Sequence, residues 1–200
     1  MTCVVGLVKS GKVYMGSDSS AVDVAGGHIF AQKSPKVFMV GQYGIAFTDS
    51  FRMGQILQYD WTPPKFTGNS RTLDKFMRTK FVESVKEAFK AGGYGSIGNQ
   101  SEAEDSGGVF LIGVKGTGRL FYMDDDFQIG ENILPYYAEG IGMDFALGSL
   151  HSTQTMRDPI KRLVSGMIEN GIYTENEYNL LLLEIKNKII ERTGYDEVMT

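Results

Sequence analysis

The chain has few of the residues that cross-link a protein or ligate metals. Of its 200 residues only one is a cysteine, Cys3, and only two are histidines, His28 and His151. A single cysteine excludes an intrachain disulfide and a multi-cysteine metal site, and it is typical of a reducing compartment. Two histidines far apart in the sequence also argue against a histidine-rich metal centre. The sequence therefore predicts a cytoplasmic protein without a bound metal or other cofactor.

Long apolar runs and an excess of positive charge are also missing. A run such as Leu180–Leu183 is far shorter than the roughly 20 residues that a membrane-spanning helix needs. The amino terminus lacks the charged and apolar regions of a signal peptide. With 20 lysines and arginines against 24 aspartates and glutamates, the net charge is −4, which argues against a general role in binding nucleic acid. We therefore expect no membrane span, no signal peptide and no nucleic-acid partner.

Proline is scarce, with 5 residues, whereas glycine is abundant, with 25. The glycines follow no fixed period, which argues against a repeat architecture, and they separate short apolar segments as turns do between strands. Hydrophobic residues make up 42% of the chain. Because a chain of this length buries about 70% of its unfolded surface, we predict a single folded domain over residues 1–200.

Predicted strands and helices follow one another in blocks. Strands are predicted at 3–8, 13–17, 28–32, 36–40, 44–48, 109–114, 119–123 and 136–141. Helices are predicted after Ser50, over 72–91, from Asp158 and from Thr174, and a polar loop is predicted over 94–107. This order lacks the regular strand–helix alternation of a doubly wound fold. It favours an α+β fold in which two sheets pack together and helices cover them.

Several segments superficially resemble ligand-binding loops. The glycine-rich segment 6–12 lacks a serine or threonine after its lysine and joins two strands, 113–118 lies in a hairpin, and 140–142 lacks a third glycine. None of these has the structural context that a nucleotide-binding loop requires. Asp124-Asp125-Asp126 places its carboxylates in a row, whereas cation-binding loops space their ligands apart. We therefore predict neither a nucleotide site nor a cation site.

Thr2 stands directly after Met1, at the head of the first predicted strand. Removal of Met1 would leave a threonine with a free α-amino group. That amine has a pKa near 8, so it can act as a base toward the threonine hydroxyl. A lysine nearby lowers the pKa of the amine further by like-charge repulsion. A threonine in second position means little by itself, so the hypothesis depends on partner residues.

Such partner residues are present in an order and spacing that resemble a known family, the proteasome β-type peptidases. The resemblance rests on Thr2-Cys3-Val4-Val5-Gly6, Gly16-Ser17-Asp18-Ser19-Ser20, Ser34-Pro35-Lys36-Val37-Phe38, Gly44-Ile45-Ala46-Phe47-Thr48 and the later segment Glu139–Gly148. It covers most of the chain and is best over residues 2–57. In style the chain is most similar to the small bacterial HslV-like subunits and their bacterial and phage relatives.

The resemblance implies a four-layer αββα sandwich, the N-terminal nucleophile (Ntn) hydrolase fold. It implies that Thr2 attacks an amide carbonyl and forms an acyl-enzyme that water hydrolyses. Lys36 would lower the pKa of the α-amino group, and Asp18 would orient Lys36. A backbone N–H near Asp49 and Ser50 would stabilise the oxyanion.

The same resemblance implies how substrate and partners bind. Ser20, Ala21 and Val22 would bind a peptide or amide substrate as an added strand. Thr48 and Met53 would shape the specificity pocket, and Gly142 would take part in binding the oxyanion or the substrate. Copies of the chain would form a homo-oligomeric ring, for which Phe51, Trp61 and Phe66 are expected to be exposed around the first helix. Docking of an ATPase is left open.

Three features depart from the family pattern. Thr48-Asp49-Ser50-Phe51 stands where the family usually has a glycine, Ile141 stands where a serine is common, and the late aspartate–serine pair is missing. The segment near 155–172 is interpreted as a helical insertion. Two alternatives to a threonine peptidase therefore stay open: a catalytically inactive proteasome-like structural subunit, and an Ntn acylase that acts on a small amide.

Overall fold

A computed structural model describes the chain at residues 2–23, 28–93, 108–155, 157–158 and 161–162. The predicted loop over 94–107 and the predicted helix from Thr174 lie outside the described residues. The predicted helix from Asp158 and the predicted insertion near 155–172 lie largely outside them.

Short strands alternate with groups of helices along the described chain. The strands are β1 (Val4–Lys9), β2 (Lys12–Ser17), β3 (Ser20–Asp23), β4 (His28–Ala31), β5 (Val37–Val40), β6 (Tyr43–Phe47), β7 (Phe110–Val114), β8 (Arg119–Met123), β9 (Ile129–Glu131) and β10 (Tyr136–Glu139). The helices are α1 (Phe51–Gln55), α2 (Ser70–Phe76), α3 (Val82–Ala91) and α4 (Met143–Ser152), with the π-helical turns η1 (Ile56–Asp60) and η2 (Met77–Phe81). The hairpin β1–β2 and the long helical segment α2–η2–α3 confirm the sequence patterns that predicted them.

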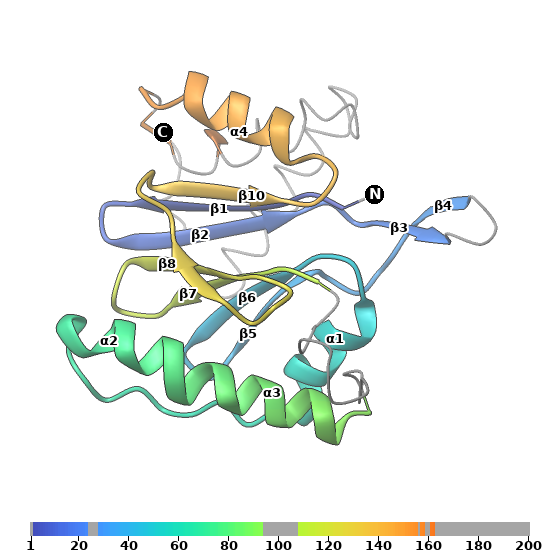
Figure 1. Cartoon of the computed structure of the whole chain (residues 1–200). Coiled ribbons are helices and arrows are strands. Elements are labelled where there is room, and N and C mark those ends of the chain that lie inside the picture. The colour runs from blue at the N-terminus through green and yellow to red at the C-terminus, as the bar shows by residue number, and fades with distance from the viewer. Residues whose placement is uncertain (1, 24–27, 94–107, 156, 159–160, 163–200) are drawn as a thin grey trace, which may run out of the picture.

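The elements form four layers (Figure 1). One antiparallel sheet has the order β10-β1-β2 and is covered by α4, and the other has the order β5-β6-β7-β8-β9 and is covered by α1, α2 and α3. The strands β3 and β4 form a separate ribbon that projects from the sandwich (Figure 1). The predicted αββα architecture is therefore confirmed.

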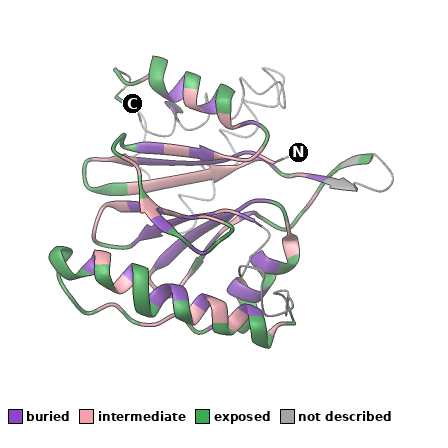
Figure 2. Ribbon diagram, viewed as in Figure 1, coloured by how far each residue is buried: buried purple, intermediate pink, exposed green. Residues whose placement is uncertain are grey.

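Alternation along β1 distributes its side chains between two cores, because successive residues of a strand point to opposite faces. Cys3, Val5 and Leu7 pack toward α4, whereas Val4 packs between the sheets with small or aliphatic partners such as Leu111. The largest core, rich in aromatic residues, lies between the second sheet and its helices. Figure 2 shows the buried residues concentrated in the strands and on the inward faces of the helices.

Three features of the local structure were not predicted from the sequence. The segment after Asp18 contains a further strand, β3, which pairs with β4. The helix α1 begins directly after Ser50, as predicted, but the Ser50 side chain makes no capping hydrogen bond to it. Trp61 is only 7% exposed and donates from its indole nitrogen to Ser84 Oγ at 2.8 Å.

The expected exposed surface around the first helix is therefore absent. Phe51 and Phe66 are partly buried against the aromatic core, like Trp61. The α2–η2–α3 segment covers two of these side chains, because Trp61 packs edge-on against Phe81 and Phe66 lies against Phe76. Phe51 packs instead against Phe47 of β6. Among the described residues, no helix is long and apolar enough to cross a membrane.

Candidate active site

The predicted catalytic residues come from three segments that the two sheets bring together. Thr2 precedes β1, and Asp18 follows β2, which pairs with β1 in the register Val4 to Ser17. The backbone N–H of Asp18 donates to the Cys3 carbonyl at 3.1 Å, so the carboxylate lies beside the start of β1. Lys36 comes from the second sheet, directly before β5. The site therefore lies where both sheets meet at one end of the sandwich.

Lys36 donates all three of its ammonium hydrogens. Its Nζ lies 3.0 Å from Asp18 Oδ1, 2.5 Å from the Ser20 carbonyl oxygen and 3.3 Å from Thr2 Oγ1. An ammonium group has three donors, so this set of acceptors fixes its position. The Lys36 and Asp18 side chains are 2% and 0% exposed, whereas Thr2 is partly exposed. A buried cation thus lies beneath a hydroxyl that solvent can reach.

Asp18 is held by the backbone as well as by Lys36. Its Oδ1 accepts a hydrogen bond from the Cys3 N–H at 2.8 Å, and its Oδ2 accepts one from the Ser20 N–H at 2.9 Å. Burial of a charge is costly unless partners satisfy it. The two N–H donors and the ammonium group together make a buried carboxylate tolerable here, and they orient it toward Lys36.

The turn between β10 and α4 packs against the backbone of the candidate nucleophile. Gly140 has φ of 93°, and a Cβ at this position would collide with the Thr2 carbonyl oxygen. The Gly142 N–H donates to that same oxygen at 3.4 Å. In the sequence this turn is Gly140-Ile141-Gly142, two glycines with one large residue between them. Ile141 points outward and is 76% exposed.

The turn before α1 holds Asp49 in an unusual conformation. Its φ is +64°, a region that favours glycine. The Thr48 hydroxyl donates to Asp49 Oδ2 at 2.6 Å and accepts from the Val109 N–H at 3.1 Å. Within the described part of the chain, the backbone N–H groups of Asp49 and Ser50 have no hydrogen-bond acceptor. They remain available to a ligand.

The remaining predicted binding residues differ in accessibility. Ser20 uses its carbonyl for Lys36 and its N–H for Asp18, and Ala21 is buried. Val22 lies on β3, whose second edge pairs with no described strand. Met53 is completely buried in the aromatic core, and Thr48 is buried beneath the turn.

Sequence reasoning missed Phe51 as a neighbour of the site. Lys36 Nζ lies 5.8 Å from the centre of the Phe51 ring, within the range of a cation–π interaction. The ring is held edge-on against Phe47, with ring centres 5.7 Å apart. An aromatic residue at the start of an amphipathic helix gives no sign that it will face a lysine 15 residues earlier.

Sequence reasoning also missed Glu139, at the end of β10. Burial raises the pKa of this half-buried carboxyl, and the nearby carboxylates of Asp124 and Asp49 add to the effect, although a hydrogen bond from the Gly140 N–H opposes it. An acidic residue at a strand end usually faces solvent, so its sequence position carried no signal. In the described part of the chain, no group of three or more histidine, cysteine or acidic side chains could hold a metal ion.

Comparison with known proteins shows similarity at the level of structure. No protein-family model and no curated protein sequence matches the chain. The structure of BPH from Thiobacillus denitrificans in complex with epoxomicin is similar with a TM-score of 0.66 and 19% identity, over 86% of this chain and 91% of that one. Another structure of the same protein has a TM-score of 0.56 and 21% identity, over 78% of this chain and 80% of that one. HslV from Trypanosoma brucei has a TM-score of 0.55 and 11% identity, over 84% of this chain and 89% of that one. This chain therefore has the proteasome-like Ntn-hydrolase fold of those structures.

Proposed function

We propose that the protein is an N-terminal threonine hydrolase that cleaves a peptide or amide bond after removal of Met1. The observation that carries the proposal is the arrangement at Thr2, whose Oγ1 lies 3.3 Å from the buried Lys36 ammonium group, itself 3.0 Å from Asp18. A purely structural role gives no reason to bury a charged pair beneath a partly exposed hydroxyl. Buried charged groups with a specific charged partner are typical of catalytic sites.

The proposed reaction uses the α-amino group of Thr2 as the base. In the mature chain this amine would take the hydroxyl proton as Oγ1 attacks the carbonyl carbon of the substrate. The positive charge of Lys36 would favour the neutral amine and so lower its pKa. The C–N bond of the substrate then breaks, the leaving amine takes the proton, and a threonyl ester remains. Water hydrolyses this ester and regenerates the hydroxyl.

Two further parts of the site support the proposal. The unoccupied N–H groups of Asp49 and Ser50 would donate to the oxyanion that forms during attack. The free edge of β3 would accept an extended substrate as an added strand, with Val22 on that strand. Thr48 would act through its hydrogen bond to Asp49, which holds the turn.

The decisive experiment combines intact-mass measurement with covalent labelling. We expect the purified protein to begin at Thr2 and to gain the mass of epoxomicin, the ligand in the similar BPH structure. The Thr2→Ala variant should keep its fold, lose hydrolysis of fluorogenic peptides and gain no mass, whereas Ser19→Ala, on a neighbouring exposed serine, should behave as wild type. Equal turnover by wild type and Thr2→Ala would refute the proposal.

A catalytically inactive subunit is the second candidate, and Ile141 is the observation that favours it. This large apolar side chain is 76% exposed beside the residue that binds the Thr2 carbonyl, which suits contact with another protein. A mature chain that retains Met1 would support this role, because a blocked amine cannot act as the base. Loss of Met1 together with epoxomicin labelling would exclude it.

Assembly into a homo-oligomeric ring and a cytoplasmic location complete the proposal. Phe145, 63% exposed and one helical turn after Ile141, provides a second apolar side chain for contact between copies. Light scattering at micromolar concentration should give a mass several times that of one chain. A monomer would argue against a peptidase confined to a chamber and would favour an acylase acting on small amides. Cell fractionation would test the location.

A further inference from the structure

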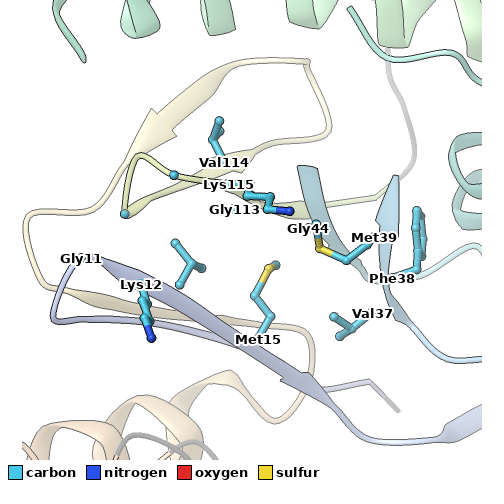
Figure 3. A pocket seen from close by; sticks show the side chains of 13 residues that line it. Gly11, Lys12, Met15, Val37, Phe38, Met39, Gly44, Gly113, Val114 and Lys115 are labelled. Carbon is cyan, nitrogen blue, oxygen red and sulfur yellow. The ribbon is translucent and has the colours of Figure 1, made fainter. Parts of the chain in front are cut away.

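The space between the two sheets differs at its two ends. At the end of the β1–β2 turn lies a cavity of about 750 Å³, which the described residues line mainly with glycines and apolar side chains. Met15 from β2 and Met39 from β5 flank Gly44 in this cavity (Figure 3). At the other end, next to the start of β1, lies a carboxyl group, that of Glu139. In the reaction proposed for Thr2, this carboxyl group has no role.

Alternation along β10 turns Glu139 toward the space between the sheets, because successive residues of a strand point to opposite faces. Ala138 packs toward α4, whereas Tyr137 packs on the opposite side, between the sheets. Glu139 lies on the same side as Tyr137 and pairs with Val4 of β1, two residues after Thr2. The carboxyl group therefore lies close to the candidate nucleophile.

The Glu139 carboxyl group holds the turn that contacts the Thr2 backbone. Its Oε1 accepts a hydrogen bond from the Gly140 N–H at 3.2 Å, and within the described part of the chain this N–H has no other acceptor. Gly140 lies so close to Thr2 that a Cβ on the glycine would collide with the Thr2 carbonyl oxygen. A small rotation of the peptide between Glu139 and Gly140 would therefore displace Thr2.

The other side of this turn is fixed to α4. The Gly140 carbonyl oxygen accepts a hydrogen bond from the Met143 N–H at 2.9 Å, and the Gly142 N–H donates to the Thr2 carbonyl oxygen at 3.4 Å. These two bonds join backbone groups, so their strength does not depend on protonation. The bond between Glu139 and Gly140 differs from them, because its acceptor is a titratable side chain.

Titratable groups lie around Glu139 on β10, at the end of β8 and in the turn before α1. They are Tyr137, Asp124 and Asp49, with Tyr122 of β8 stacked on Tyr137. Burial raises the pKa of Glu139, the hydrogen bond from the Gly140 N–H opposes this, and the two aspartates raise the pKa further. Among the described residues, no lysine or arginine forms a salt bridge with Glu139.

An ionised carboxyl group is therefore costly at this position. Burial of a charge without a counter-ion is unfavourable, and a glutamine or an apolar residue would avoid that cost. What the charge of Glu139 provides is a stronger hydrogen bond to the Gly140 N–H, since a charged acceptor binds an N–H roughly twice as strongly as a neutral one. The cost is explained if the position of the turn matters for Thr2.

We propose that Glu139 is a positioning residue for Thr2: its carboxylate holds the Gly140 N–H, and this turn sets the position of the Thr2 backbone. The effect on the rate rests on the proposed hydrolysis at Thr2, whereas the contact itself does not. Protonation of Glu139 replaces a charged acceptor by a neutral one and weakens the bond. The acid limb of hydrolysis should therefore contain a second ionisation besides that of the α-amino group, with a loss of about tenfold.

NMR of the full-length protein tests the contact without requiring activity. Glu139-Gly140 is the one Glu-Gly pair of the sequence, and Cys3, the one cysteine, follows Thr2. Labelling with ¹³C-carbonyl glutamate and ¹⁵N-glycine therefore selects the Gly140 amide, and ¹³C-carbonyl threonine with ¹⁵N-cysteine selects the Thr2 carbonyl carbon. As pH falls, both signals should show a step with the same midpoint. Glu139→Gln, labelled with ¹³C-carbonyl glutamine, keeps an acceptor oxygen and should lose this step from both signals.

A change of charge beside Glu139 tests which group produces the step. Asp124→Asn removes a neighbouring negative charge, so the shared midpoint should move to lower pH. The matched control Asp125→Asn removes an equal charge from the adjacent exposed position and should leave the midpoint in place. Different midpoints for the two signals, a step that persists in Glu139→Gln, or equal shifts in the two asparagine variants would overturn the proposal.

Hydrolysis of a fluorogenic peptide tests the consequence for the reaction. Glu139→Ala leaves the Gly140 N–H without its acceptor. At a pH above both ionisations and at equal concentrations of folded protein, it should lower kcat by at least about tenfold and change KM less than about twofold, because a displaced nucleophile slows the chemical step. Glu139→Gln should recover most of this loss and show one ionisation on the acid side where wild type shows two. An unchanged kcat in Glu139→Ala, or a Glu139→Gln protein as slow as Glu139→Ala, would overturn the proposal.

Failure of the proposed hydrolysis would give a different result. Wild type and all variants would then neither cleave the peptide nor gain the mass of epoxomicin. The NMR titration would still decide whether Glu139 sets the position of Thr2, since it needs no turnover. Absence of a shared midpoint at Gly140 and Thr2 would overturn the positioning role in an active and an inactive protein alike.

Discussion

Replacing Lys36 with methionine tests the buried charged pair directly, whatever the reaction. Methionine keeps most of the volume of the lysine stem but removes the ammonium group, so the completely buried Asp18 carboxylate loses its counter-ion. Loss of one partner of a buried pair costs about 3–5 kcal/mol of unfolding free energy. Asp18 retains two hydrogen bonds, from the N–H groups of Cys3 and Ser20, which places the expected loss near the lower limit, about 3 kcal/mol.

A double-mutant cycle separates the pair from the packing of its two side chains. Asp18→Asn alone leaves the Lys36 ammonium group without its anion, whereas Asp18→Asn/Lys36→Met removes both charges. The double variant should therefore be less destabilised than the sum of the two single variants, by about 1–3 kcal/mol. Urea unfolding at neutral pH, followed by circular dichroism, measures each corner of the cycle.

Thermal unfolding gives an independent measurement. A loss of about 3 kcal/mol should lower the Tm of a chain of this size by about 6–12 °C. Lys33→Met is the control, because Lys33 is exposed on the same segment and should change stability by no more than about 0.5 kcal/mol. Additive effects of the two single substitutions, or a Lys36→Met protein as stable as Lys33→Met, would show that Lys36 and Asp18 do not interact as the structure indicates.

Three other predictions follow from local geometry. Asp49→Val should be less stable than Asp49→Gly by about 1–2 kcal/mol, because φ is +64° at this position; equal urea midpoints would contradict this. Gly140→Ala should lower both the stability and the rate of hydrolysis, because the added Cβ would collide with the Thr2 carbonyl oxygen. An unchanged rate in peptidase assays at equal concentrations of folded protein would contradict this. Hydrogen bonds from the Arg119 and, to a smaller extent, the Arg78 guanidinium groups lower the pKa of Asp74 to about 2. The part of the stability that wild type gains over Arg119→Met through Asp74 is therefore full above about pH 4 and shrinks as pH falls toward about 2. A stability difference between wild type and Arg119→Met that stays constant as pH falls from about 4 to about 2 would disprove this pH dependence.

The elements that were predictable depend on local patterns. The β1–β2 hairpin follows from two apolar runs around a Gly-containing turn, and α2–η2–α3 follows from apolar residues at helical spacing between 72 and 91. By contrast, the segment that forms β3 consists of small and polar residues around Val22. Its strand depends on pairing with β4, and no local sequence pattern indicates that pairing. Trp61 looked exposed because its neighbours are prolines and polar residues, yet the return of α3 across the sheet buries it.

The sequence alone indicated most of the elements and two packed sheets covered by helices, because hydrophobic periodicity is local, one-dimensional information. Its resemblance to the proteasome β-type peptidases pointed to Thr2, Asp18 and Lys36 as the candidate catalytic residues. Only the tertiary structure decided how deeply Lys36 and Asp18 are buried, that Phe51 faces the ammonium group, and that a cavity opens between the sheets. Those properties depend on the way one sheet packs on the other, because solvent exclusion and cavity shape are set by side chains far apart in the chain.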